Sequence, residues 1–197
     1  LDAKNPISED SLLTGKLEPT NSPYAIAKIS AIEIGRALNH QYGHNVLNIM
    51  PTNLYGPGDN FSEKESHVIP GLISRMHKSK VQNDSEFKIW GSGEPLREFL
   101  YVDDLTRSIE FLIGKKTDED LLNIGSGEEI KILELAEMVK NIVGFEGKLI
   151  FDSSMPDGNP RKLIDSSKIN SMGWHPQTKL EDGIELSYKW FLKKKNN

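Results

Sequence analysis

The chain has 197 residues, of which 37% are hydrophobic and 27% are charged, and its formal net charge of -5 argues against a nucleic-acid-binding protein, which normally carries a basic excess. This length and mixed charge predict one globular domain with a real core rather than a disordered chain, and the absence of cysteine excludes disulfides and cysteine-ligated metals. No apolar run approaches ~18 residues and no signal peptide is visible, so we expect a soluble cytoplasmic protein without a membrane partner.

The first segment, residues 1–20, is predicted to be a loop, because Pro6, Gly15 and Pro19 are spread among polar residues. A domain rarely opens on so long a stretch without regular structure. The chain also begins with Leu1 rather than Met. We therefore expect that Leu1 follows an upstream part of a longer protein.

Helix and strand signals alternate along the rest of the chain. The first helix is predicted over 23–42, with Thr20 or Asn21 as its cap and Gly43 as its end. Further helices are predicted over 67–80, 103–114, 130–143, 165–172 and 180–195, strands over 45–50, 87–90, 97–102, 121–124 and 148–151, and a loop over 51–66. This alternation predicts an α/β fold with parallel strands.

Tyr24 and Lys28 are the first candidates for chemistry. They stand four residues apart on the first predicted helix, which places both side chains on one face. A phenol beside an ammonium can pass a proton to or from a carbonyl or alcohol oxygen. Taken alone, this spacing is common, and an ordinary surface pair is the better interpretation.

The surrounding motifs favour a functional role for Tyr24 and Lys28 over an ordinary surface pair. The segments are NSPYAIAK at 21–28, PTNLYGP at 51–57, REFLYVDD at 97–104 and NIGSG at 123–127. In this order they resemble the extended short-chain dehydrogenase/reductase family. Five longer stretches, LLTGKLEPTNSPYAIAK, MPTNLYGPGDNF, SHVIPGLISR, WGSGEPLREFLYVDD and PDGNPRKLID, are similar to the branch that acts on GDP-4-keto-6-deoxy-D-mannose, and the likeness covers roughly the whole chain.

The resemblance implies an incomplete doubly wound, Rossmann-type parallel sheet with a C-terminal substrate-binding lobe. Residues 1–60 and 98–126 would be the remnant of the NADP-binding domain, and residues 61–97 and 127–197 the substrate-binding lobe. The implied reaction is NADPH-dependent 3,5-epimerisation and 4-reduction of the GDP-sugar to GDP-L-fucose by a homodimer. The glycine-rich NADP turn and a catalytic serine and cysteine would lie upstream of Leu1, so we expect the isolated chain to be inactive.

The resemblance also implies roles for individual residues. Tyr24 would protonate the C4 oxygen as hydride arrives, Lys28 would hold the nicotinamide ribose, and His67 would reprotonate carbon during epimerisation. The residues implied to bind NADP(H) are Lys28, Pro51, Thr52, Asn53, Leu54 and His67. The residues implied to hold the GDP-sugar are Arg75, Trp90, Arg97 and Lys162.

Several of these residues have plain structural alternatives. On position alone, His67 is equally well a helix-entry residue bonded to the hydroxyl of Ser66, and the SHVIP motif favours the functional interpretation. Trp90 could pack in the core at a strand end, and Lys162 could simply be exposed to solvent.

Arg97 could form a salt bridge with Glu98 or Glu94 instead of gripping a pyrophosphate. The glycine pairs Gly91/Gly93 and Gly125/Gly127 lack a third glycine at the spacing of a dinucleotide fingerprint. Both pairs are therefore predicted to be turns.

Three other functions remain open. One is another nucleotide-sugar enzyme of the same family, such as a 4-epimerase or a 4,6-dehydratase. The others are a catalytically silent binding protein on the same fold and a purely structural fragment. The presence of Tyr24, Lys28 and His67 together argues against a silent relative, which has no need for all three.

Overall fold

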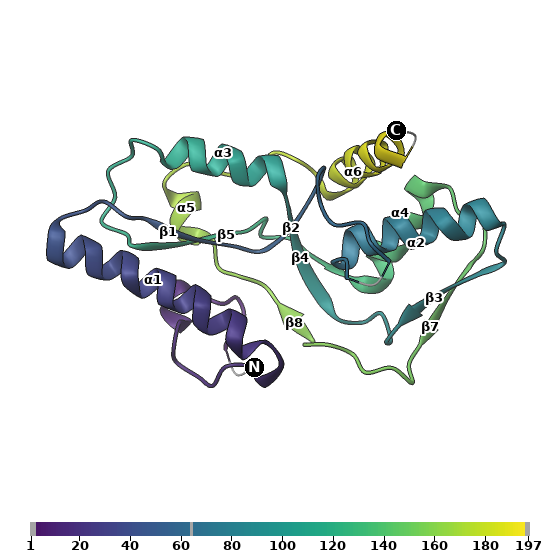
Figure 1. Ribbon diagram of the computed structural model, residues 1–197, viewed down its shortest axis with the longest axis horizontal. Helices are drawn as coiled ribbons and strands as arrows, with labels where there is room; N and C mark the ends of the chain where they lie inside the picture. The colour runs from purple at the N-terminus through teal and green to yellow at the C-terminus, as the bar shows by residue number, and fades with distance from the viewer. Residues whose placement is uncertain (1–2, 64, 196–197) are drawn as a thin grey trace.

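The computed structural model describes residues 3–63 and 65–195, in which helices alternate with mostly parallel strands (Figure 1). The helices are α1 (Ser22–Tyr42), α2 (Val68–Gln82), α3 (Val102–Leu112), α4 (Ile132–Val143), α5 (Ser167–Ser171) and α6 (Leu180–Lys195), with short 3-10 helices η1 (Glu9–Ser11) and η2 (Pro19–Asn21). The strands are β1 (Asn48–Pro51), β2 (Asn53–Tyr55), β3 (Glu86–Trp90), β4 (Leu96–Tyr101), β5 (Leu121–Ile124), β6 (Glu129–Lys131), β7 (Lys148–Asp152) and β8 (Arg161–Lys162). The α/β class expected from the sequence is confirmed.

The described strands form three small sheets. β1 pairs with β5 and β3 pairs with β7, both in parallel. β4 is the centre of the third sheet, where it pairs in parallel with β2 and β8 and antiparallel with β6. Parallel neighbours need long crossover connections. The helices between the strands supply them, which gives the Rossmann-like arrangement expected from the sequence.

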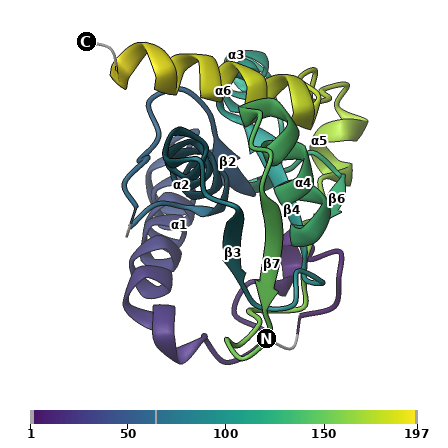
Figure 2. The same ribbon diagram turned by 90° about the vertical axis from the view of Figure 1, so that its right-hand side faces the viewer.

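Two apolar clusters pack the helices against the strands. α1 and α3 lie on opposite sides of the β1–β5 pair (Figure 1), whereas α2, α4 and α6 gather at the other end over β3 and β7 (Figure 2). The first cluster lies under α3 and α5 and contains Leu100, Leu112, Leu122, Ile124, Ile169 and Trp174. The second lies among α2, α4, α6 and β3 and includes Ile69, Ile73, Met76, Phe87, Leu135, Val139 and Ile184.

Strand β4 joins the two clusters. Leu100 belongs to the first cluster, whereas its neighbours Phe99 and Tyr101 belong to the second. Successive side chains of a strand point to opposite faces, so one strand can serve two cores. The C-terminal half of β4 is therefore packed on both faces, and the half-buried Arg97 lies in the same strand.

Helix α1 matches its prediction in extent but not in its cap. Its last turn ends at Gly43, whose φ of 66° lies in the left-handed region that glycine tolerates. Asn21 is the N-cap residue but makes no side-chain capping bond, and the hydroxyl of Thr20 donates to Glu18 Oε1 at 2.6 Å instead. The expected side-chain cap is therefore wrong.

The main corrections concern short strands that carry little sequence signal. The loop expected over 51–66 contains β2, and β6 and β8 were not expected at all. The helix predicted from residue 130 begins at Ile132, because 129–131 forms β6. Such short segments show no clear alternation, and their partners lie far away in the chain.

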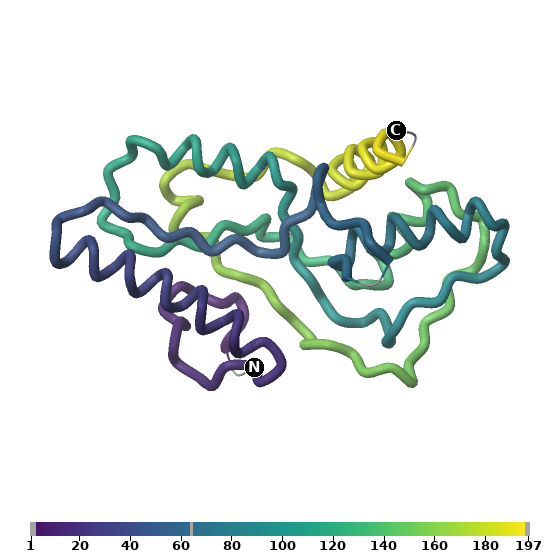
Figure 3. Tube along the Cα trace, viewed as in Figure 1, coloured from purple at the N-terminus to yellow at the C-terminus, as the bar shows by residue number. Residues whose placement is uncertain are grey.

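The N-terminal segment is also more structured than expected. Besides η1 and η2, Ile7 forms a parallel bridge with Ile164, which fixes the start of the chain beside the segment that follows β8 (Figure 3). Glu9 is buried there, and its carboxylate accepts a hydrogen bond of 2.9 Å from the backbone N–H of Asn123. The loop predicted over 1–20 is therefore confirmed for most of residues 3–20 and is wrong at Ile7, at η1 and at the start of η2, while residues 1–2 lie outside the described residues.

Candidate active site

Tyr24 and Lys28 share one face of α1, as their spacing predicts. The ammonium of Lys28 lies 5.5 Å from the centroid of the Tyr24 ring, a cation–π distance. Tyr24 is 61% exposed although it is large and partly apolar. The first turns of α1 thus present a phenol and an ammonium side by side at the surface.

Residues 51–54 connect the ends of two sheets. The backbone N–H of Thr52 donates to the carbonyl of Ile124 at 3.0 Å, and the amide of Asn53 donates to the carbonyl of Glu98 at 2.8 Å. The segment is half-buried and starts at the carboxyl end of β1, next to the carboxyl end of β5. Ligands of open α/β sheets bind at this edge.

His67 immediately precedes α2 and is exposed. Its carbonyl accepts the N–H of Gly71 at 2.9 Å, so its backbone starts the helix. Within residues 3–63 and 65–195, no hydrogen bond joins His67 to Ser66, and the bonded-pair alternative is therefore wrong. No hydrogen bond or ion pair within that same part joins His67 to Tyr24 or Lys28.

Arg75 is held between α2 and β3. Its Nε donates to the carbonyl of Gly71 at 3.2 Å, and its guanidinium lies 5.4 Å from the centroid of the Phe87 ring. Burial lowers the pKa of Arg75 and the charge of Glu63 opposes this shift. An arginine nevertheless stays protonated at neutral pH, so the site contains a partly desolvated cation.

Trp90 lies on the other face of β3. Phe87 and Ile89 are buried, whereas Trp90 is 70% exposed. The alternative of core packing is therefore wrong. An exposed indole offers a flat apolar face on which a planar ring could stack.

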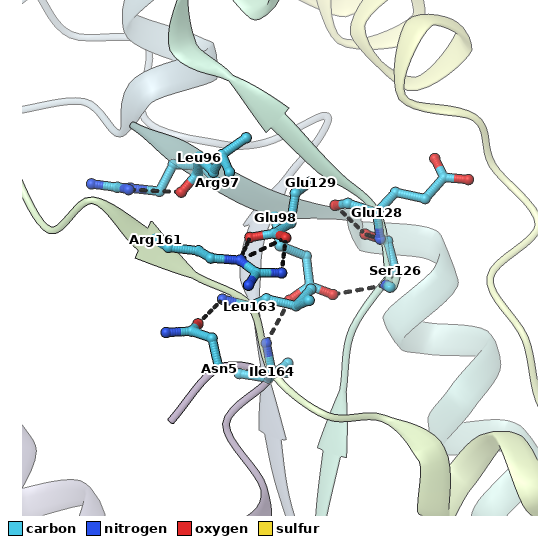
Figure 4. Close-up of polar contacts among 11 residues, drawn as sticks. Asn5, Leu96, Arg97, Glu98, Ser126, Glu128, Glu129, Arg161, Leu163 and Ile164 are labelled. Atoms are coloured by element: carbon cyan, nitrogen blue, oxygen red, sulfur yellow. Dashed lines mark hydrogen bonds and ion pairs between the residues drawn. The ribbon is translucent and has the colours of Figure 1, made fainter. Parts of the chain in front are cut away.

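Arg97 and Lys162 are neighbours in the parallel register of β4 and β8. Residues paired in this way project from the same face of a sheet. Nη1 of Arg97 donates to the carbonyl of Leu96 at 2.8 Å, and the side chain extends away from Glu98 (Figure 4). Lys162 is exposed.

The alternative of a salt bridge between Arg97 and Glu98 or Glu94 is wrong, because no such pair is formed among the described residues. Glu94 pairs with Lys131 at 2.8 Å, and Glu98 is bound by backbone N–H groups. Burial lowers the pKa of Arg97 and the nearby charge of Asp157 opposes this shift, so the side chain remains cationic.

Ser92 and Asp157 form a contact that the sequence did not suggest. The N–H and hydroxyl of Ser92 donate to the two carboxylate oxygens of Asp157 at 2.9 and 2.6 Å, and these bonds lower the pKa of Asp157. They hold the loop after β7 over the turn at Gly91 and Gly93, where both φ angles are positive as expected for turns. The only signal in the sequence was the Asp157-Gly158 step in PDGNPRK.

The Arg97 side chain lies beside this loop. A Cβ added to Gly158 would lie 3.1 Å from Nη2 of Arg97, so the loop passes close to the guanidinium. A small hollow opens here, lined by Glu94, Pro95, Asp157, Gly158 and Pro160. The described residues contain no group of three potential metal ligands, and none of their helices is long and apolar enough to cross a membrane.

Comparisons with known proteins find a matching family and similar relatives. Residues 2–125 match the model of the NAD dependent epimerase/dehydratase family. The chain is 53% identical over 190 residues to a probable GDP-L-fucose synthase 1 from Oryza sativa subsp. japonica, covering 96% of this chain and 58% of that protein. It is 45% identical over 199 residues to the GDP-L-fucose synthase of Escherichia coli strain K12, covering 96% of this chain and 62% of that protein.

A solved structure shows the same fold. A GDP-L-fucose synthetase from Naegleria fowleri bound to NADP aligns with a TM-score of 0.91 at 32% identity, covering 100% of this chain and 63% of that chain. The chain thus spans less than two thirds of the length of each of these three relatives.

Proposed function

The chain belongs to the NAD dependent epimerase/dehydratase family, and we propose that its full-length parent converts GDP-4-keto-6-deoxy-D-mannose to GDP-L-fucose with NADPH. The reaction joins a 3,5-epimerisation to a 4-reduction, which makes the enzyme multifunctional. The observation that carries the proposal is the exposed Tyr24–Lys28 pair, with 5.5 Å between ammonium and ring, in a chain similar to GDP-L-fucose synthases over nearly its whole length.

The activity is proposed for a longer protein, because the chain spans 58% of its rice relative. We assign residues 1–60 and 98–126 to an NADP-binding domain, and residues 61–97 and 127–197 to a substrate-binding lobe. The isolated 197-residue chain is then inactive.

The residues at the sheet edge fit one part of an NADPH site. The exposed Lys28 would hold the nicotinamide ribose, and residues 51–54, fixed by their bonds to Ile124 and Glu98, would line the nicotinamide side together with His67. Bound NADPH supplies the hydride that reduces C4. Tyr24 delivers the proton to the C4 oxygen, and Lys28 lies on the same face of α1 beside its ring.

His67 serves the epimerisation. A ketone at C4 acidifies the hydrogens on C3 and C5, so a base can remove one of them and leave an enolate. An acid must then return a proton to the opposite face of the ring. An imidazole holds or releases a proton near neutral pH, and that of His67 is exposed and unbonded in the described part of the chain.

Four side chains bind the GDP-sugar in this proposal. Arg97 and Lys162 face one side of β4 and β8 and would bind the diphosphate, for which the planar fork of arginine is suited. Trp90 would stack on a ring of the GDP-sugar. Arg75 would contact another part of the same GDP-sugar.

We also propose a cytoplasmic homodimer without membrane or nucleic-acid partners. Ile26 and Ile34 of α1 are 53% and 60% exposed, and both lie outside the stripe of α1 that packs on the protein. Such apolar side chains could form part of an interface between subunits. A second copy of α1 would cover them.

The test is an assay of the full-length parent with GDP-4-keto-6-deoxy-D-mannose and NADPH. NADPH consumption and GDP-L-fucose formation are measured together, and Tyr24→Phe is the inactive control. Turnover of UDP-galactose or GDP-mannose instead would identify a 4-epimerase or a 4,6-dehydratase. Ligand binding without any turnover would identify a silent binding protein.

A further inference from the structure

Glu98 is a buried carboxylate without a cation. Its side chain is 0% exposed in the middle of β4, and it forms no ion pair within 4 Å in the described part of the chain. The nearest candidates are engaged or turned away, because Arg161 pairs with Glu129 at 2.6 Å and Arg97 projects from the opposite face (Figure 4). A buried charge is costly unless other groups satisfy it.

Two backbone N–H groups satisfy this carboxylate. Oε1 accepts the N–H of Gly127 at 2.8 Å, and Oε2 accepts the N–H of Ile164 at 3.2 Å. Gly125 has no room for a side chain, because an added Cβ would overlap Oε1. One side chain thus joins β4 to the turn after β5 and to the segment that follows Lys162.

The backbone carbonyl of Glu98 binds the segment at 52–53, which is proposed to lie on the nicotinamide side of the site. The carbonyl of Glu98 accepts the amide of Asn53 at 2.8 Å and the hydroxyl of Thr52 at 3.4 Å. Thr52 and Asn53 lie in the segment proposed to line the nicotinamide. Arg97, proposed to hold the diphosphate, is the residue before Glu98.

We propose that Glu98 is a positioning residue that fixes the nicotinamide-side segment at 52–53 relative to the diphosphate-binding pair Arg97 and Lys162. This inference rests on the proposed function. Hydride transfer requires the two ligands in near-attack geometry, so a small relative shift slows the reaction even where each ligand still binds. A carboxylate suits this task because two charge-assisted acceptor atoms hold two chain segments at once.

The experiment replaces Glu98 by Gln in the full-length parent. Glutamine has the same length but only one acceptor oxygen, so its NH2 group meets an N–H group and one segment is released. The matched control is Glu129→Gln, on the neighbouring strand opposite Glu98 in the register. That change breaks the pair with Arg161 but touches no residue assigned to a ligand.

Three quantities are measured well below the melting temperature: kcat, the Kd of NADPH alone and the Kd of GDP alone. For Glu98→Gln we expect kcat to fall about 10- to 100-fold while both Kd values stay within about threefold of wild type. For Glu129→Gln we expect all three to stay near wild type. A residue that only stabilises the fold would lower the melting temperature and leave kcat per folded molecule unchanged, and that result overturns the inference.

The remaining outcomes are also decisive. If Glu98→Gln does not fold, Glu98→Asp, which keeps the charge but reaches only one N–H group, is judged by the same three quantities. If the wild type is active and the Glu98 variant is equally active, the inference about Glu98 is overturned and the proposed function is not. A wild type without turnover overturns the proposed function, and the role of Glu98 with it.

Discussion

Arg97 of β4 and Lys162 of β8 stand opposite each other in register and project from the same face, while neither forms an ion pair within the described part of the chain. Arg161, the residue before Lys162 in β8, lies on the other face and forms an ion pair with Glu129 at 2.6 Å. One face of β4 and β8 thus carries two cationic side chains without an ion pair within the described residues. An anionic ligand could pair with these two cations, whereas Arg161 already has a carboxylate partner.

Removing either cation should therefore weaken GDP binding. We expect Arg97→Ala and Lys162→Ala each to raise the Kd of GDP about 10- to 100-fold, because a hydrogen bond to a charged group contributes about 1.5–3 kcal/mol. Isothermal titration calorimetry on the full-length parent measures the effect. Arg161→Ala is the control and should leave the Kd within about threefold, since exposed pairs contribute little. An equal loss in all three variants would contradict the assignment.

Tyr24 should matter for chemistry and not for stability. Tyr24→Phe removes one hydroxyl from a side chain that is 61% exposed, so the melting temperature should stay at the wild-type value. The loss of a general acid should lower kcat about 10²- to 10⁴-fold. Tyr42→Phe is the control, because Tyr42 lies on the same helix and is 70% exposed. Similar activity in the two variants would exclude Tyr24 as the acid.

His67 should act on the ring carbons. We expect His67→Asn to slow solvent deuterium incorporation at C3 or C5, measured by NMR without NADPH, about 10²-fold or more. His77→Asn is the matched control on α2. It loses the 3.0 Å bond between Nδ1 and the hydroxyl of Tyr188, which should lower the melting temperature and leave exchange unchanged. Undiminished exchange in His67→Asn would assign the carbon acid elsewhere.

Local patterns account for what the sequence predicted correctly. The end of α1 at Gly43 and the shared face of Tyr24 and Lys28 depend on residues within one or two helical turns. Such features are encoded by neighbours in the chain. They therefore need no knowledge of the tertiary structure.

Long-range contacts account for what was missed. Ser92 meets Asp157 across 65 positions of sequence, and Glu98 meets Ile164 across 66. β8 has only two residues and exists because it pairs with β4. No periodicity in a single segment indicates which distant segment will complete it.

Asp104 gives a prediction about pH. Its side chain is 1% exposed at the start of α3 and accepts the backbone N–H groups of Gln177 and Thr178 at 2.8 and 3.0 Å and the guanidinium of Arg107 at 2.6 Å. Burial by itself raises the pKa of Asp104, but these hydrogen bonds, led by that of Gln177, outweigh it and lower the pKa below its ordinary value of 3.8. The folded state therefore binds this proton less readily than the unfolded state does.

The sign of the pH dependence follows from this lowered pKa. The stability that Asp104 contributes is fully present above the unfolded value of 3.8 and is lost as the pH falls through the lower folded value. We expect Asp104→Asn to reduce the free energy of unfolding by about 1.5–3 kcal/mol at neutral pH, since it weakens bonds to a charged acceptor. Urea unfolding of the parent at neutral pH and near pH 3 should show that the difference in the free energy of unfolding between wild type and Asp104→Asn becomes smaller in acid. The control is Asp103→Asn, at the exposed neighbouring position, whose free energy of unfolding should stay close to that of wild type at either pH. If the difference between Asp104→Asn and wild type did not change with pH, the carboxylate of Asp104 would not be the stabilising group.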